Sequence, residues 1–306
     1  MNLIKPKKLK QGDTIGLLSI SGDIDNYENI QNAENFFRAK GYKTIVSETT
    51  YKHFRYHAGS DEERVLALHK FFTDKDVDAI VCTCGGYGLI RIIDKIDYRL
   101  IAKNPKIFCG YSDITALLTM MCKKSHLLCF QGPMASGDFG IQNVSYFTEK
   151  SFFETLTGAG NNIYTADECG QVLHKGVAKG ILWGGNLTTI ASMAGNFFIP
   201  NEKFVFFIED VNEPAYKVDR MLTQLFRIEK FAKNIQGLAV GVFSGVGEIK
   251  YVNEVLEEYT SKYNIPCCDG FKISHERDKY TLPIGVKCEL SADEKFIKIN
   301  ENLFSD

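Results

Sequence analysis

The feature that most constrains the fold is an alternation, in the first half of the chain, between short apolar runs and amphipathic stretches. The apolar runs lack a polar–apolar repeat, which is typical of strands buried on both faces of a sheet. They are TIGLLSIS at 14–21, VDAIVCTC at 77–84, KIFC at 106–109 and LLCF at 127–130. The stretches between them predict helices, including one opened by a capping box at Ser60 and Glu63 and a short one at 89–96. This half therefore predicts a parallel sheet covered by helices on both faces.

The second half is richer in strands. Its predicted strands are the apolar runs at 176–185, 203–210, 237–246, 281–291 and 295–300, and its predicted helices are the stretches at 218–231 and 252–263. A polar stretch with glycine and asparagine, at 159–171, is typical of a connection between domains. We therefore predict an α/β protein of two domains. The first is an N-terminal parallel-sheet domain at 1–158, and the second is a smaller, strand-rich C-terminal domain at 170–306.

Charge and cysteine content exclude several classes of protein. A formal net charge of −2 and the lack of a basic run interleaved with aromatic residues argue against nucleic-acid binding. No apolar stretch approaches the roughly 20 residues that cross a bilayer, and the first 21 residues lack the order of a signal peptide. The nine cysteines show no C-x-x-C spacing, which favours buried thiols in a reducing compartment over disulfides or zinc. We therefore expect a cytoplasmic protein without membrane contact or metal.

Two glycine-bearing turns follow neighbouring strands of the predicted sheet. Gly85 and Gly86 follow one strand, and Gly110 leads into Ser112 after the next. Because the carboxyl ends of parallel strands meet at one edge, we expect these turns to lie together. Ser112 also precedes a predicted helix, whose unpaired N–H groups favour a developing oxyanion, as in a nucleophile elbow. However, Ile114 stands where G-x-S-x-G has its second glycine, and the alternatives are a helix N-cap at Ser112 and a simple tight turn at the glycine pair.

A nucleophilic serine needs a base, and a third group usually orients that base. Among the six histidines, His275 stands out because it lies in a charged loop just before a strand, in ISHERDKYTLPIGV. His53 and His57 are four residues apart, but Phe54 occupies the position where a zinc protease carries glutamate. Glu209 ends the apolar strand KFVFFIED and is the candidate carboxylate. Taken singly, each of these residues is also explained as a solvated loop residue.

Longer motifs are spread from one end of the chain to the other. They are GGYG, GYSDITALL, GPM, GGNLTTIASMAGN, IEDVNEPAYKVDRMLTQL and a late histidine followed by TLPIGV. Together they resemble the LD-carboxypeptidase family of serine peptidases, whose members include muramoyl-tetrapeptide carboxypeptidase and the microcin C immunity peptidase. The resemblance implies a triad of Ser112, His275 and Glu209, with the backbone N–H groups of Gly86 and Asp113 as the oxyanion hole. It implies an active site in the cleft between the two domains, where the N-terminal domain carries the nucleophile and the C-terminal domain carries the glutamate and histidine of the triad. It also implies release of terminal D-Ala from murein tetrapeptides in cell-wall recycling, by a homodimer that needs no cofactor.

Two positions depart from the family pattern and bear on substrate contacts more than on the chemistry. Cys84 stands where the family often has arginine, and Gln131 where many members have histidine. Cys84 is also an alternative nucleophile, but its strand context favours an inert buried thiol. Two other functions remain open: cleavage of an aminoacyl-nucleotide amide, and binding of muropeptides without catalysis. The lack of a long aromatic insertion near Trp183 disfavours the first, and the complete triad disfavours the second.

Overall fold

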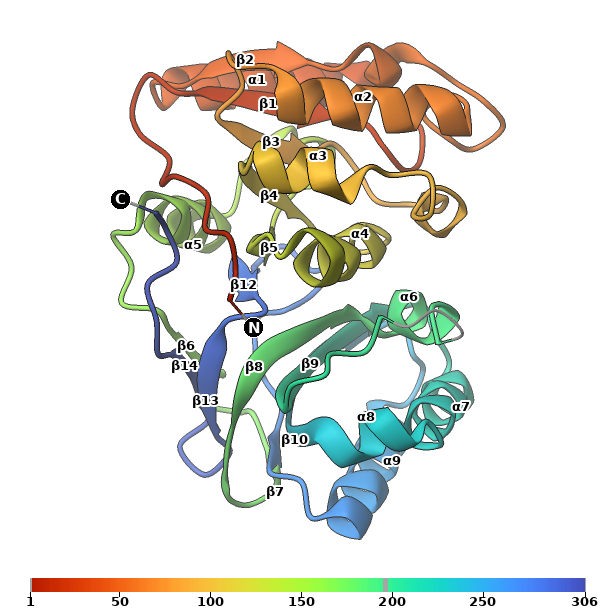
Figure 1. The fold of residues 1–306 in the computed structure, drawn as a ribbon. Helices are drawn as coiled ribbons and strands as arrows, with labels where there is room; N and C mark the ends of the chain where they lie inside the picture. Colours follow the sequence, from red (N-terminus) through yellow and green to blue (C-terminus); the bar gives the residue numbers. More distant parts are fainter. Residues whose placement is uncertain (1, 195–197, 306) are drawn as a thin grey trace. The chain divides into compact units, whose positions relative to one another are not determined.

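The computed structural model describes residues 2–194 and 198–305, which divide into two compact units (Figure 1). The first unit comprises Asn2–Gly160, Tyr280–Pro283 and residues 303–305, and the second comprises Asn161–Lys279 and Ile284–Asn302. The chain therefore returns to the first unit twice after it has entered the second. The domain boundaries expected from the sequence stay a prediction.

The first unit is built on a six-stranded sheet with the strand order β12-β5-β4-β3-β1-β2. The strands from the N-terminal half pair in parallel, each with its neighbour. The strands of this sheet are β1 (Thr14–Leu18), β2 (Lys43–Val46), β3 (Ala79–Cys82), β4 (Ile107–Gly110), β5 (Cys129–Gln131) and β12 (Leu282–Ile284). Parallel pairing of the fully buried strands β1, β3, β4 and β5 confirms the fold class predicted from the uninterrupted apolar runs.

Helices cover both faces of this sheet. They are α1 (Tyr27–Ala39), α2 (Asp61–Thr73), α3 (Tyr98–Lys103), α4 (Ile114–Met120) and α5 (Tyr146–Thr157). In Figure 1, α2, α3 and α4 lie in one row, while the rings of Phe37 and Phe152, 6.0 Å apart, join α1 to α5. The predicted capping box is confirmed, because the Ser60 amide donates to Glu63 Oε2 at 2.8 Å and the Glu63 amide donates to Ser60 Oγ at 3.2 Å.

The short helix predicted at 89–96 is wrong. A single 3-10 turn occupies Leu89–Arg91, and the next helix, α3, begins only at Tyr98. The cap explains this start, because the side chain of Asp97 accepts hydrogen bonds from the amides of Arg99 and Leu100.

The second unit contains an eight-stranded mixed sheet with the order β6-β14-β13-β8-β9-β10-β11-β7. Strands β8 to β11 pair in parallel, and the outer pairs are antiparallel. The strands are β6 (Ile163–Thr165), β7 (Val172–His174), β8 (Val177–Asn186), β9 (Phe204–Val211), β10 (Ile235–Ser244), β11 (Cys267–Cys268), β13 (Lys287–Ser291) and β14 (Phe296–Ile299). Since β6 lies within 159–171, the stretch predicted as a connection also supplies an edge strand.

The helices of the second unit are α6 (Leu187–Ser192), α7 (Ala215–Phe226), α8 (Glu229–Asn234) and α9 (Ile249–Tyr263). The helix predicted at 218–231 is thus broken into α7 and α8. The break turns the ring of Phe231 into a cluster with Phe204, Phe206 and Phe226, at centroid distances of 5.2–5.4 Å. Such aromatic pairs stabilise the fold beyond the burial of their surface, which favours the break at this place.

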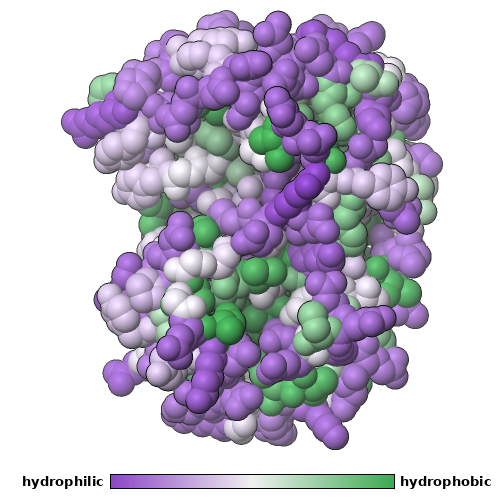
Figure 2. All heavy atoms as spheres, turned by 180° about the vertical axis from the view of Figure 1, so that it is seen from behind, coloured by the Kyte–Doolittle hydropathy of each residue, from purple (hydrophilic) through white to green (hydrophobic). Residues whose placement is uncertain are grey.

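Two further features of the structure are the polarity of one face and the state of the cysteines. Hydrophilic residues cover most of the face drawn in Figure 2, and hydrophobic residues form smaller groups on it. In the part of the chain that the structure describes, no helix has both the length and the apolar content for a membrane span. All nine cysteines lie in the described ranges and are free thiols, and only Cys169 is exposed.

Candidate active site

Ser112 lies in a strained turn between β4 and α4. β4 ends at Gly110, α4 begins at Ile114, and Ser112 between them has a φ of 62°. A residue with a side chain is disfavoured in this left-handed region, and such strain is a feature of nucleophile elbows. Gly110 permits the turn, because a Cβ there would lie 2.9 Å from the Ile114 side chain and 3.2 Å from Cys82 Cβ. Close packing of strand and helix therefore depends on a glycine in the strand, without the second glycine of the motif.

The hydroxyl of Ser112 does not cap the helix that follows it. Across residues 2–194 and 198–305, no amide of α4 donates to Ser112 Oγ. The cap position is Asp113, which also makes no side-chain cap, and the Thr115 amide donates to the Ser112 carbonyl oxygen at 2.9 Å. The simple N-cap interpretation is therefore wrong, and the strained serine needs another explanation.

The glycine loop after β3 lies directly against this serine. A Cβ on Gly85 would lie 2.8 Å from Ser112 Cβ, 2.9 Å from its Oγ and 3.6 Å from the Asp113 amide nitrogen. Within the described ranges, neither the Gly86 amide nor the Asp113 amide donates a backbone hydrogen bond. Amide donors beside a hydroxyl are the components of an oxyanion hole. The first unit thus brings together the residues that the sequence places after two different strands.

Glu209 and His275 form a hydrogen-bonded pair in the second unit. Glu209, in the last part of β9, is fully buried, and its Oε2 accepts a hydrogen bond from His275 Nδ1 at 2.6 Å. Burial by itself would lower the pKa of His275, but the hydrogen bond and the charge of Glu209 outweigh it, so the pKa is raised above its ordinary value. With Nδ1 donating to a carboxylate, the neutral ring carries its lone pair on Nε2, as a general base requires.

Asp210 holds this strand end to the start of α6. Its Oδ1 accepts from Asn186 Nδ2 at 2.9 Å, and its Oδ2 accepts from the Thr188 amide and hydroxyl, both at 2.8 Å. Asn186 is the register partner of Glu209 on β8, and it also caps α6 by accepting from the Thr189 amide. Asp210 is assigned no role from the sequence alone. Its place beside Glu209, at the end of an apolar strand, is the signal that could have indicated one.

The two positions that depart from the family pattern both lie in the first unit. Cys84 Sγ donates to the Gly22 carbonyl oxygen at 3.3 Å, and burial raises the pKa of the thiol to about 11. A thiol that stays protonated at neutral pH is a poor nucleophile, which supports the interpretation of Cys84 as inert. Gln131 ends β5, is buried, and pairs in register with Gly110, two residues before Ser112.

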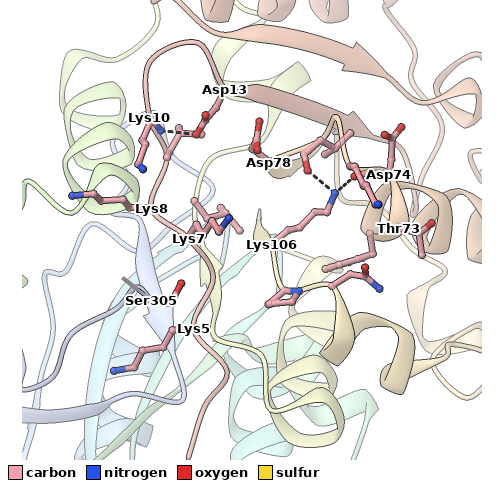
Figure 3. A pocket seen from close by; sticks show the side chains of 17 residues that line it. Lys5, Lys7, Lys8, Lys10, Asp13, Thr73, Asp74, Asp78, Lys106 and Ser305 are labelled. Carbon is pink, nitrogen blue, oxygen red and sulfur yellow. Dashed lines mark hydrogen bonds between the residues drawn. The ribbon is translucent and has the colours of Figure 1, made fainter.

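A hollow of about 500 Å³ lies at the opposite edge of the first unit's sheet (Figure 3). Its lining includes Asp13, Asp78 and Lys106, which precede β1, β3 and β4. Lys106 donates to the carbonyl oxygens of Asp74 and Val77, so its ammonium group already has hydrogen-bond partners within the protein. Because Ser112 follows the carboxyl end of β4, this hollow is at the wrong end of the strands to present a substrate to it.

Comparisons with known proteins agree with the fold and with the motifs. The family model for the LD-carboxypeptidase N-terminal domain matches residues 15–132, and that for the LD-carboxypeptidase C-terminal domain matches residues 179–290. A probable murein peptide carboxypeptidase from Bacillus subtilis (strain 168) is 36% identical over 298 residues, which cover 95% of this chain and 92% of that protein.

Solved structures give the same result. The wild-type apo structure of the microcin C7 self-immunity protein MccF, a protein of Escherichia coli, has a TM-score of 0.91 at 28% identity and covers 99% of this chain and 100% of its own. The muramoyltetrapeptide carboxypeptidase from Oxalobacter formigenes has a TM-score of 0.82 at 30% identity and covers 93% of this chain and 97% of its own. With both domain models matched and relatives aligned over nearly its whole length, the chain belongs to the LD-carboxypeptidase family.

Proposed function

We propose that this protein is a serine carboxypeptidase that hydrolyses the L,D-amide bond before the terminal D-Ala of murein tetrapeptides, in cell-wall recycling. The observation that carries the proposal is the Ser112 turn. Its backbone is strained, its hydroxyl lies against a glycine loop, and the amides of Gly86 and Asp113 donate no backbone hydrogen bond in the described ranges. The names of the Bacillus subtilis and Oxalobacter formigenes relatives support the substrate class.

In this mechanism, His275 accepts the proton of Ser112 as the hydroxyl attacks the carbonyl carbon before D-Ala. Glu209 keeps the imidazole in the tautomer with Nδ1 protonated and stabilises the imidazolium that forms. The proposal therefore requires the serine of the first unit and the Glu–His pair of the second unit to act on the same substrate molecule.

The tetrahedral intermediate places its negative oxygen on the amides of Gly86 and Asp113. Each such donor contributes on the order of 3 kcal/mol to lowering the barrier. His275 then protonates the departing D-Ala amine, leaving an acyl group on Ser112, and water activated by the same imidazole hydrolyses this ester. His275 carries the proton from Ser112 to the leaving amine and later from water back to Ser112, so the mechanism needs neither a metal nor an organic cofactor.

Cleavage of an aminoacyl-nucleotide amide is the second candidate, because the MccF fold matches so closely. A nucleobase is commonly held by a stacked aromatic ring. Trp183, the one tryptophan, is 1% exposed and packs against Phe198, Phe204 and Phe206 at centroid distances of 5.1–5.5 Å. Its ring is therefore occupied within the core, and we rank this candidate second.

The test is an assay of the purified protein with murein tetrapeptides that contain either L-Lys or meso-diaminopimelate. Release of free D-Ala supports the proposal, and a tetrapeptide ending in L-Ala serves as the matched control. Cleavage of an aminoacyl-nucleotide alone would instead support the second candidate. Tight binding without turnover would identify a muropeptide-binding protein.

A cytoplasmic location and a homodimeric state belong to the same proposal. Free cysteines, most of them buried, are typical of a reducing compartment. The homodimer rests on the family resemblance alone, and sedimentation of the purified chain at several concentrations measures it directly.

Gly85→Ala is expected to lower kcat by about 100-fold, since misplacing reacting groups by about 1 Å has an effect of this size. The new methyl group would lie 2.8 Å from Ser112 Cβ and 2.9 Å from its Oγ, so the loop and the serine must move apart. The measurement is D-Ala release under saturating tetrapeptide. Gly137→Ala is the control, because a Cβ there meets nothing within 4 Å, and a comparable loss in that variant would contradict the steric explanation.

The pH dependence of kcat/KM is expected to follow His275. A general base works only when neutral, so activity rises with pH and reaches half its maximum above the ordinary histidine pKa of about 6.5. The midpoint is shifted upward because the charge of Glu209 stabilises the protonated imidazole of His275 and raises its pKa. Rates between about pH 5 and pH 9 give the midpoint, and NMR titration of His275 in a Ser112→Ala variant checks its origin. A midpoint below 6.5 in both measurements would exclude a controlling Glu209–His275 pair.

A further inference from the structure

We propose that the carboxylate of Asp113 is a positioning residue that holds the two halves of the oxyanion hole together. This role is separate from that of the Asp113 amide, which is one of the two proposed donors. The inference rests on the proposed function, because an oxyanion hole matters only if Ser112 attacks a carbonyl group.

One oxygen of Asp113 joins three segments of the first unit. Its Oδ2 accepts a hydrogen bond from Ser21 Oγ at 2.6 Å and from the Leu89 amide at 3.0 Å. Ser21 lies just after β1, and Leu89 ends the glycine loop that begins at Gly85. Asp113 itself directly follows the nucleophile, so its side chain ties the Ser112 turn to both other segments.

The segment after β1 and the glycine loop also touch each other directly. The Gly22 amide donates to the Gly85 carbonyl oxygen at 2.9 Å, and a Cβ on Gly86 would lie 3.1 Å from Gly22 Cα. With these two segments joined, the bonds of Asp113 Oδ2 set where the Ser112 turn sits against them. The relative position of the Gly86 and Asp113 amides therefore depends on this carboxylate.

Burial makes these hydrogen bonds effective. Asp113 is 7% exposed and Ser21 is fully buried, so water does not replace either bond at low cost. Burial raises the pKa of Asp113, while its two donors and the charge of Arg64 act in the opposite direction. Arg64, also fully buried, donates from Nη1 to the Ile20 carbonyl oxygen at 3.0 Å, which fixes the residue next to Ser21.

The two hydrogen bonds end on the same oxygen, which allows a sharp test with two variants of the full chain. Asp113→Asn keeps an oxygen that can accept both bonds, whereas Asp113→Ala keeps none. We expect Asp113→Ala to lower kcat for D-Ala release by about 100-fold with KM changed by less than about 3-fold. Asp113→Asn should stay within about 10-fold of the wild-type kcat, because its carbonyl oxygen still accepts both hydrogen bonds.

Amide hydrogen exchange provides a readout that does not depend on turnover. The Leu89 amide should exchange faster in Asp113→Ala and retain its protection in Asp113→Asn. Asp78→Ala is the matched control, since it removes a carboxylate that accepts from the Thr14 amide, at 2.9 Å, at the opposite edge of the sheet. That variant should change neither kcat nor exchange at Leu89.

The outcomes separate this inference from the proposed function. If the wild type releases no D-Ala but Leu89 still loses protection in Asp113→Ala, the positioning contact stands and the proposed activity fails. If the wild type is active and Asp113→Ala keeps its kcat within about 3-fold, the inference is overturned. An Asp113→Asn variant as slow as Asp113→Ala would overturn it as well, because the loss would then follow charge and not the shared acceptor.

Discussion

Ser112→Ala is expected to lower the rate of D-Ala release by about 10⁶-fold, the loss typical of removing a serine nucleophile from a complete triad. The variant should still bind the tetrapeptide, because alanine removes only one hydroxyl oxygen. It also creates no clash and buries no new polar group, so folding is expected to be preserved. Rate measurements with the purified variant and titration calorimetry with the tetrapeptide test both parts.

Cys84→Ser is the matched control for this variant, because Cys84 is the other candidate nucleophile of the first unit. Its thiol donates to the Gly22 carbonyl oxygen, and a serine hydroxyl can make the same bond. We expect kcat of Cys84→Ser to stay within about 3-fold of the wild type. Residual activity above about 1% in Ser112→Ala, together with a large loss in Cys84→Ser, would move the nucleophile to the cysteine.

Glu209→Gln is expected to lower kcat by about 10⁴-fold while leaving KM nearly unchanged, as in other triads that lose the charge of the third member. The uncharged amide no longer stabilises the imidazolium, and its NH₂ group can face His275 and impose the wrong tautomer. The pKa of His275 should fall at the same time, since burial still lowers it and the charge that raised it is gone. Steady-state kinetics and NMR titration of His275 measure the two effects.

Asp210→Asn is the comparison variant for Glu209→Gln. It changes the neighbouring buried carboxylate, whose bonds run to Asn186 and Thr188 at the start of α6. The main expected effect is a lower melting temperature, because at least one buried hydrogen bond is lost. A kcat loss in Asp210→Asn as large as that in Glu209→Gln would show that strand packing, and not the charge facing His275, governs the rate.

Several parts of the fold could be predicted because they depend on residues close together in the chain. The capping box at Ser60 and Glu63 is such a case, and so are the apolar runs that became β1, β3, β4 and β5. The rule that parallel strands share one carboxyl edge was enough to place Gly85 near Ser112. Each of these predictions needed only local pattern and one topological principle.

Other parts could not be predicted because long-range packing decided them. The break between α7 and α8 follows from the contacts of Phe231 with β9, which no local pattern encodes. The contacts of Asp113 with Ser21 and Leu89 join residues 92 and 24 positions apart. The sequence shows that an aspartate follows the candidate nucleophile. The hydrogen-bond partners of this aspartate depend on how the segments that carry Ser21 and Leu89 pack against it.

The neighbours Glu209 and Asp210 show which features the sequence determines and which only the tertiary structure determines. The sequence by itself determined that two carboxylates end a buried strand, and the family motif singled out the first of them. Successive side chains of a strand point to opposite faces, so the two carboxylates must have different partners. Only the tertiary structure decided that Glu209 meets His275 while Asp210 meets the start of α6, because the pairing of β8 with β9 and the course of the loop carrying His275 set what lies on each face.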